Sequence, residues 1–182
     1  IPGMVVINPS DDIEAREAVK AAYSYDGPVY LRFGRLAVPV INDAVTYKFQ
    51  IGKGVELRDG TDCTIIATGL CVSESLAAAE LLAQKGVEAQ VINIHTIKPL
   101  DEELVIQAAE KTGCVFTVEE HSVIGGLGAA VAEVLSEKCP TKIYRIGVKD
   151  VFGESGPAKA LLHKYELDAE GITKQIIDRL MK

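Results

Sequence analysis

Apolar and polar positions along most of this chain follow the periods of a protein in which strands alternate with helices. The run 63–68 is a continuous apolar strand of the kind that is buried on both faces. Three further strands are expected at 87–94, 115–118 and 143–148. Apolar residues at helical spacing occur at 72–83 and again at 172–180. This alternation predicts an α/β fold of three layers (α/β/α) with a mostly parallel, mixed sheet, in which a strand near 55–58 pairs at an edge.

The first 38 residues carry a shorter pattern of the same kind. Apolar strands are expected at 4–8 and 29–33. The apolar face of the helix between them is formed by four residues: Ala15, Ala18, Val19 and Ala22. Asp11 and Glu14 have the spacing of a capping box at the start of this helix. The segment is therefore predicted to form one βαβ unit.

A stretch without either period separates this unit from the rest of the chain. Its turn-forming residues include Pro39, Asn42, Asp43 and Gly52. We therefore expect a βαβ unit over residues 1–38, a linker over 39–53 and a larger domain over 54–182.

The charge pattern and the cysteine spacing indicate which partners are disfavoured and in which state the thiols are expected. The net charge of −7 is spread over interspersed acidic and basic residues. This pattern disfavours nucleic acid and anionic membranes as partners. The four cysteines lack the paired spacing of a zinc site, so we expect free thiols in a cytoplasmic protein.

Two arginines, Arg32 and Arg35, stand at the end of the second predicted strand. Ligands of α/β folds bind at the carboxyl ends of strands, where a guanidinium can hold a phosphate through two parallel hydrogen bonds. Solvated or ion-paired arginines explain the same spacing, and the spacing alone favours that interpretation.

A glycine-rich turn follows the predicted strand at 115–118, in the sequence VEEHSVIGGLG at 118–128. Glu120 and His121 are candidates for an acid/base pair, and the start of the following helix is a candidate anion site. The glycines match neither a dinucleotide fingerprint nor a P-loop. Close packing of helix on strand accounts for them, which leaves open the roles of His121 and the 125–128 turn.

A second motif, FGESGPA at 152–158, precedes a short apolar helix. Ser155 lacks the nucleophile elbow and the histidine partner of a hydrolase. We expect it to be a helix N-cap, with Pro157 in the first turn. His95 and His163 are likewise expected to be structural or interfacial.

Three stretches together resemble one group of enzymes. The FGES-x-PA stretch closely resembles the C-terminal end of transketolases. The 118–128 stretch and NIHTIKPLD at 93–101 resemble segments shared by transketolases, deoxyxylulose-phosphate synthases and the β subunits of 2-oxoacid dehydrogenases. Residues 1–38 resemble the tail of the pyrimidine-binding domain of a transketolase, and residues 54–182 resemble its C-terminal domain.

The resemblance implies transfer of a two-carbon ketol unit between sugar phosphates, in the cytoplasmic pentose phosphate pathway. In that family, thiamine diphosphate and Mg²⁺ are held by upstream segments, so no catalytic, cofactor-binding or metal-binding residue is expected in this chain. Arg35 matches the arginine that binds the substrate phosphate in the family. The resemblance implies that the isolated chain is inactive and that it works as a homodimer completed by an N-terminal transketolase portion or subunit.

Two other interpretations stay open. The chain could be part of a deoxyxylulose-phosphate synthase or a 2-oxoacid dehydrogenase β subunit, which an assay with pyruvate would distinguish from a transketolase. A non-catalytic dimerisation or regulatory module is an alternative of another class. The partial pyrimidine-binding domain argues against that module.

Overall fold

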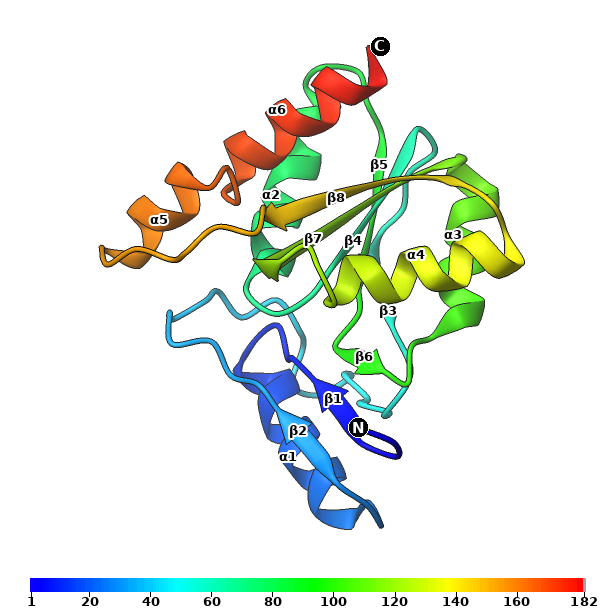
Figure 1. The fold of residues 1–182 in the computed structure, drawn as a ribbon, viewed down its shortest axis with the longest axis vertical. Helices are drawn as coiled ribbons and strands as arrows, with labels where there is room; N and C mark the ends of the chain where they lie inside the picture. The colour runs from blue at the N-terminus through cyan, green and yellow to red at the C-terminus, as the bar shows by residue number, and fades with distance from the viewer. Residues whose placement is uncertain (182) are drawn as a thin grey trace.

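Residues 1–181, which the computed structural model describes, form eight strands and six helices (Figure 1). The strands are β1 Val5–Ile7, β2 Val29–Leu31, β3 Val55–Arg58, β4 Cys63–Ala67, β5 Ala89–Asn93, β6 Thr96–Lys98, β7 Cys114–Ser122 and β8 Lys142–Val148. The helices are α1 Asp12–Ser24, α2 Cys71–Ala83, α3 Glu102–Thr112, α4 Leu127–Lys138, α5 Ala158–Lys164 and α6 Ala169–Leu180. None of these helices is long and apolar enough to cross a membrane.

Five strands form the larger sheet, in the order β3-β5-β4-β7-β8. All neighbouring pairs are parallel except β3 with β5 at the edge. One apolar core packs α2 and α6 against one face of this sheet, and a second core packs α3 and α4 against the other face. Every residue of β4 and β5 is buried, as the continuous apolar run of β4 predicts for that strand. The predicted three-layer fold with a mostly parallel, mixed sheet is confirmed, and the strand expected at its edge, β3, pairs antiparallel.

A second, smaller sheet has the order β2-β1-β6. The parallel pair β1–β2 and helix α1 form the predicted βαβ unit. Strand β6 pairs antiparallel with β1 and belongs to the larger part of the chain. The apolar pattern does not indicate β6, because this strand has three residues, mixes polar with apolar ones and stops before Pro99.

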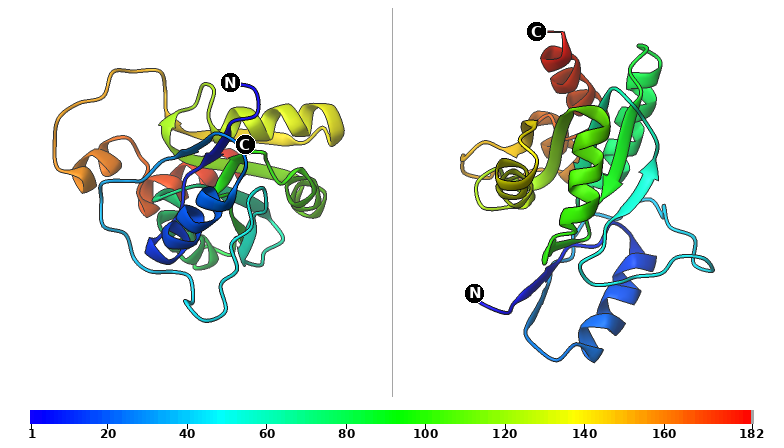
Figure 2. Two further views of the ribbon diagram at one scale, coloured as in Figure 1. Left: turned by 90° about the horizontal axis from the view of Figure 1, so that it is seen from below. Right: turned by 90° about the vertical axis from the view of Figure 1, so that its right-hand side faces the viewer.

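The small sheet and α1 lie against the carboxyl ends of the parallel strands of the larger sheet (Figures 1 and 2). Thr68, just after β4, donates a hydrogen bond to the carbonyl oxygen of Asn8 (3.3 Å). Glu120, near the end of β7, pairs with Arg32 (3.4 Å). The N-terminal unit therefore covers the edge at which α/β folds bind their ligands.

Two local predictions are wrong. Val19 is 48% exposed, and only Ala18 of the predicted apolar face is buried. The other side chain of α1 that is fully buried is the carboxylate of Glu14. Ser155 is not an N-cap, because the irregular segment extends to Pro157, which itself occupies the N-cap position of α5.

The buried carboxylate of Glu14 joins segments that are far apart in the sequence. It accepts hydrogen bonds from the Ser10 N–H (2.6 Å) and from Asn93 Nδ2 at the end of β5 (2.9 Å). The hydroxyl of Tyr47, in the predicted linker, donates a third hydrogen bond. Burial and the charge of Glu14 raise the pKa of Tyr47, so its hydroxyl remains a donor. A buried anion is tolerated here because three donors surround it.

We predict that Glu14→Ala lowers the free energy of unfolding by about 2–4 kcal/mol, because it leaves buried donors without an acceptor. Urea denaturation of the purified chain measures this change. Glu17→Ala, three residues along the same helix in an exposed pair with Lys20, should change it by less than about 0.5 kcal/mol. Equal effects of the two substitutions would contradict the role given to Glu14.

Candidate functional site

Arg35 lies on the irregular segment that follows β2. Its side chain is exposed, and the ion pairs of residues 1–181 do not include it. An exposed guanidinium beyond the carboxyl end of a parallel strand is available to an anionic ligand. The phosphate contact of Arg35 stays a prediction.

The far end of the Arg35 segment is bound to the start of α1. Asp11 Oδ2 accepts hydrogen bonds from the N–H groups of Ile41 (2.9 Å) and Asn42 (2.8 Å). Asp11 Oδ1 accepts from the N–H of Glu14 (2.8 Å) and thereby caps α1, as the capping-box spacing predicts. One buried carboxylate therefore fixes both the helix and the end of the segment.

The near end and the middle of the segment are also anchored. The N–H of Arg32 donates to the carbonyl oxygen of Ile7 (2.8 Å). Leu36 and Val38, which flank Arg35 on its C-terminal side, pack against the apolar core of the larger sheet. The backbone around Arg35 is thus held on both sides while its side chain faces solvent.

A hollow of about 310 Å³ lies beside Arg35, between this segment and the first turn of α1. Its lining residues are Pro9, Ser10, Asp11, Asp12, Ala15, Phe33, Gly34, Leu36, Ala37, Val38, Val40 and Leu70. The neighbours of Arg35 on both sides belong to this lining. Arg35 is therefore next to a concave surface along the chain, while its own side chain is not part of the lining.

Arg32 lies in a different place from Arg35. Its guanidinium pairs with Glu120 (3.4 Å), and it lines a larger cleft of about 560 Å³ between the small sheet and α4. His121 also lines this cleft. Burial and the nearby Arg32 lower the pKa of His121, against the opposing charge of Glu120. Glu120 is engaged with an arginine, so the geometry does not single out an acid/base pair of Glu120 and His121.

The position of the Glu119 side chain explains the glycine-rich sequence of the turn before α4. Its buried carboxylate accepts hydrogen bonds from the N–H groups of Leu127 and Gly128 (2.8 Å each), at the N-terminus of α4. A Cβ added at Gly126 would lie 2.0 Å from Glu119 Oε2, so only glycine fits there. Burial raises the pKa of Glu119, although these two N–H groups oppose the shift. The turn is explained by packing and capping.

His95 is a structural residue, as expected. It is 1% exposed, its Nδ1 lies 2.8 Å from the hydroxyl oxygen of Thr96, and its ring packs on that of Phe49 at 4.3 Å between centroids. Burial lowers its pKa despite the charges of Glu14 and Asp101. Through these contacts, His95 connects Thr96 at the start of β6 with Phe49 in the predicted linker.

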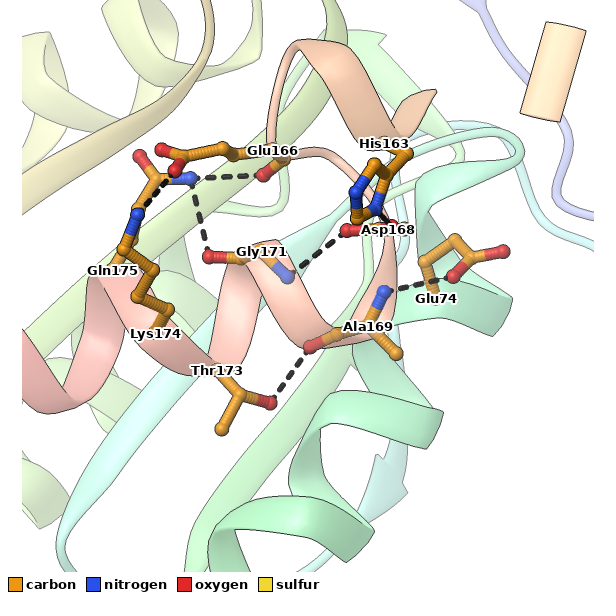
Figure 3. A network of polar contacts seen from close by, with 9 residues as sticks. All are labelled: Glu74, His163, Glu166, Asp168, Ala169, Gly171, Thr173, Lys174 and Gln175. Atoms are coloured by element: carbon orange, nitrogen blue, oxygen red, sulfur yellow. Dashed lines mark hydrogen bonds and ion pairs between the residues drawn. The ribbon is translucent and has the colours of Figure 1, made fainter. Parts of the chain in front are cut away.

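His163 takes part in the polar contacts at the start of α6 (Figure 3). Asp168 Oδ1 accepts from the N–H of Gly171 (2.9 Å) and caps the helix, while its Oδ2 lies 2.6 Å from His163 Nδ1. With Glu170 these residues form the one group within 1–181 that offers three metal-ligating atoms. None of its residues lines either hollow, and Asp168 already serves as the helix cap and as the partner of His163.

The group of His163, Asp168 and Glu170 does not fit the Mg²⁺ that accompanies thiamine diphosphate. A diphosphate-bound Mg²⁺ takes oxygen ligands in octahedral geometry beside the phosphates. The His163 group offers an imidazole, and it adjoins no cavity lined for a cofactor. We therefore assign no cofactor ligand to the described part of the chain.

The four cysteines are all free, and the two buried ones are not reactive candidates. Cys63 and Cys71 are fully buried. Burial raises the pKa of the Cys63 thiol to about 12 and raises that of Cys71 as well. Both thiols are therefore protonated and inert at neutral pH.

Sequence reasoning recognised Asp11 and Glu14 only as a capping-box pair and missed the other bonds of the carboxylates that organise the site. Asp11 and Glu119 each bind several backbone N–H groups, Glu14 binds one, and Asp101 binds both the N–H of Gly54 (3.0 Å) and the start of α3. The available signal was an acid next to a predicted helix start, which marks a cap. It does not show that the same acid also binds a distant segment.

The ionisation of Asp11 predicts a pH dependence of stability. Burial favours a higher pKa, but the N–H groups of Glu14, Asn42 and Ile41 outweigh it and hold the pKa of Asp11 below its usual 3.8. The ionised form therefore stabilises the fold above that value, and this contribution is lost as the pH falls through the lowered pKa. In urea denaturation, the stability gap between wild type and Asp11→Asn should be smaller near pH 3 than near pH 6. A gap that is unchanged or wider in acid would contradict this account.

We also predict that Gly126→Ala destabilises the chain by about 1–3 kcal/mol, because its Cβ would displace the Glu119 carboxylate. Gly153→Ala is the control, since a Cβ there has no atom within 4 Å. Denaturant unfolding of both variants measures the difference. A neutral Gly126→Ala would show that the turn is not set by this contact.

Comparison with known proteins places the chain in a family. The family model described as "Transketolase, C-terminal domain" matches residues 52–172. The 6-deoxy-6-sulfo-D-fructose transketolase subunit of Clostridium sp. (strain MSTE9) is 48% identical over 174 residues, which cover 96% of this chain and 54% of that protein. The 1-deoxy-D-xylulose-5-phosphate synthase 1 of Geobacter sulfurreducens is 42% identical over 177 residues, covering 94% of this chain and 28% of that protein.

The solved structure of a split-gene transketolase, described as an inactive β4 tetramer, matches all of this chain and 59% of its own with a TM-score of 0.95 and 45% identity. The chain thus spans about half the length of its split-type relatives and less of the synthase. On the family match and these identities, the chain belongs to the transketolase family and corresponds to its C-terminal part.

Proposed function

We propose that this chain is the C-terminal part of a transketolase that transfers a two-carbon ketol unit between sugar phosphates. The observation that carries the proposal is Arg35, an exposed guanidinium without an ion-pair partner among the described residues. Its chain neighbours Gly34 and Leu36 line a hollow beside the segment that follows β2. A substrate phosphate is the ligand that such a group binds through two hydrogen bonds.

The transketolase family depends on thiamine diphosphate, and the described residues do not fit this cofactor. We therefore place thiamine diphosphate and Mg²⁺ on another portion or subunit, and propose that this chain alone is inactive. Its own residues would orient the phosphate end of the substrate and pack against the portion that holds the cofactor.

The proposed partners are an N-terminal transketolase portion or subunit and a second copy of the chain. The 48% identity to a transketolase subunit supports an assembly made from separate parts. We extend the proposal to the cytoplasm and to the pentose phosphate pathway, where sugar phosphates of this type are exchanged. The remnant of a pyrimidine-binding domain over 1–38 is part of the same proposal, supported by its βαβ form.

A deoxyxylulose-phosphate synthase is the second candidate, because one such enzyme is 42% identical over nearly the whole chain. The two reactions differ in their donor: a ketose phosphate for the transketolase and pyruvate for the synthase. The complete assembly should therefore be assayed with xylulose 5-phosphate plus ribose 5-phosphate, and separately with pyruvate plus an aldose phosphate. Turnover with the first pair alone supports the transketolase, and turnover with pyruvate overturns it.

We predict that Arg35→Ala raises the KM for xylulose 5-phosphate about 10- to 100-fold in that assembly, because charge-assisted hydrogen bonds to the phosphate are lost. The KM for unphosphorylated xylulose should not change. Arg179→Ala, an exposed arginine on α6, is the matched control. An Arg35→Ala enzyme with wild-type KM for the phosphorylated donor would remove Arg35 from the site.

A further inference from the structure

We propose that Asp11 is a positioning residue for Arg35: its second carboxylate oxygen holds the end of the segment that carries the guanidinium. This inference rests on the proposed function, because the consequence for substrate binding requires that Arg35 contacts the phosphate. It adds a residue from α1 to a site that sequence reasoning assigned to Arg35 alone.

The two carboxylate oxygens of Asp11 bind different segments of the chain. Capping α1 uses Oδ1, which accepts from the N–H of Glu14 at 2.8 Å. Oδ2 is not needed for the cap and accepts instead from the N–H groups of Ile41 and Asn42, 30 and 31 residues away, at 2.9 and 2.8 Å. The side chain is almost fully buried, so water does not compete for these bonds.

The position of the bonded residues explains how Asp11 acts on Arg35. Arg35 stands between the anchored N–H of Arg32 and the two N–H groups held by Asp11. Without the second anchor, the stretch from 36 to 42 would keep the packing of Leu36, Val38 and Ile41 and a long contact of Asn42 Nδ2 with Ser10 Oγ (3.4 Å), but it would lose both backbone bonds to Asp11. The guanidinium would then sample more positions, and ordering it on the substrate would cost binding free energy.

Another N-cap offers a matched comparison. Asp168 caps α6 through Oδ1 in the same way, but its Oδ2 contacts only the exposed His163 among the described residues. Replacing either aspartate by serine keeps a good N-cap and removes the second oxygen. The substitution Asp11→Ser therefore removes the anchor, and Asp168→Ser repeats the same chemical change away from the Arg35 segment.

The experiment has two readouts. Hydrogen exchange of the Ile41 and Asn42 amides in the purified chain reports the anchor directly, and we expect exchange at least about tenfold faster in Asp11→Ser. In the complete assembly, Asp11→Ser should raise the KM for xylulose 5-phosphate about three- to tenfold, while kcat and the KM for unphosphorylated xylulose stay within about twofold. Asp168→Ser should change none of these.

Two results would overturn the inference that Asp11 positions Arg35. Faster exchange with an unchanged KM shows that the anchor does not position Arg35, and a loss of kcat with both donors shows a general structural effect. If Asp11→Ser does not fold, Asn42→Pro removes the N–H bond to Asp11 together with the Nδ2 contact to Ser10 Oγ (3.4 Å), and leaves the cap intact. An Arg35→Ala enzyme with wild-type KM overturns the phosphate role itself, whereas a defective Arg35→Ala beside an inert Asp11→Ser overturns only the role of Asp11.

Discussion

The arrangement of this chain depends on carboxylates that are buried and fully engaged by donors from separate segments. Glu14 receives hydrogen bonds from three segments, and Asp11 binds both its own helix and the stretch after β2. A buried anion is costly unless every lone pair finds a donor, so these contacts allow few relative positions of α1, the linker and β5. The N-terminal unit is held by directional polar bonds as much as by its small apolar core.

This constraint links the fold to the proposed function. The unit is held against the carboxyl ends of the large sheet, and the segment after β2 emerges there (Figure 1). Arg35, on this segment, is exposed. The N-terminus of α4 at the glycine-rich turn, by contrast, is occupied by the Glu119 carboxylate. We therefore propose the anion site at Arg35 rather than at the N-terminus of α4.

The larger sheet could be predicted from the sequence because its central strand β4 is a continuous apolar run and the other strands alternate along the chain with segments of helical period. The buried face of α1 could not be predicted from the sequence, since its apolar residues are small and its most buried polar group is Glu14. Strand β6 is too short to show a period, and it forms because β1 supplies its partner. Asp11 could be recognised as a cap from local spacing, but its bonds to residues 41 and 42 depend on the tertiary fold. The position of Arg35 beyond a strand followed from the predicted strand end and from the resemblance. The hydrogen bonds that anchor its segment to Ile7 and Asp11 could not be predicted in this way.

We propose that this chain completes an enzyme whose cofactor is held elsewhere. The decisive experiment is calorimetric titration with thiamine diphosphate and Mg²⁺, first of the purified chain and then of the chain assembled with its N-terminal portion. We expect no binding to the chain alone and binding to the assembly. Micromolar binding to the chain alone would contradict the proposal and would place a cofactor site among the residues described above.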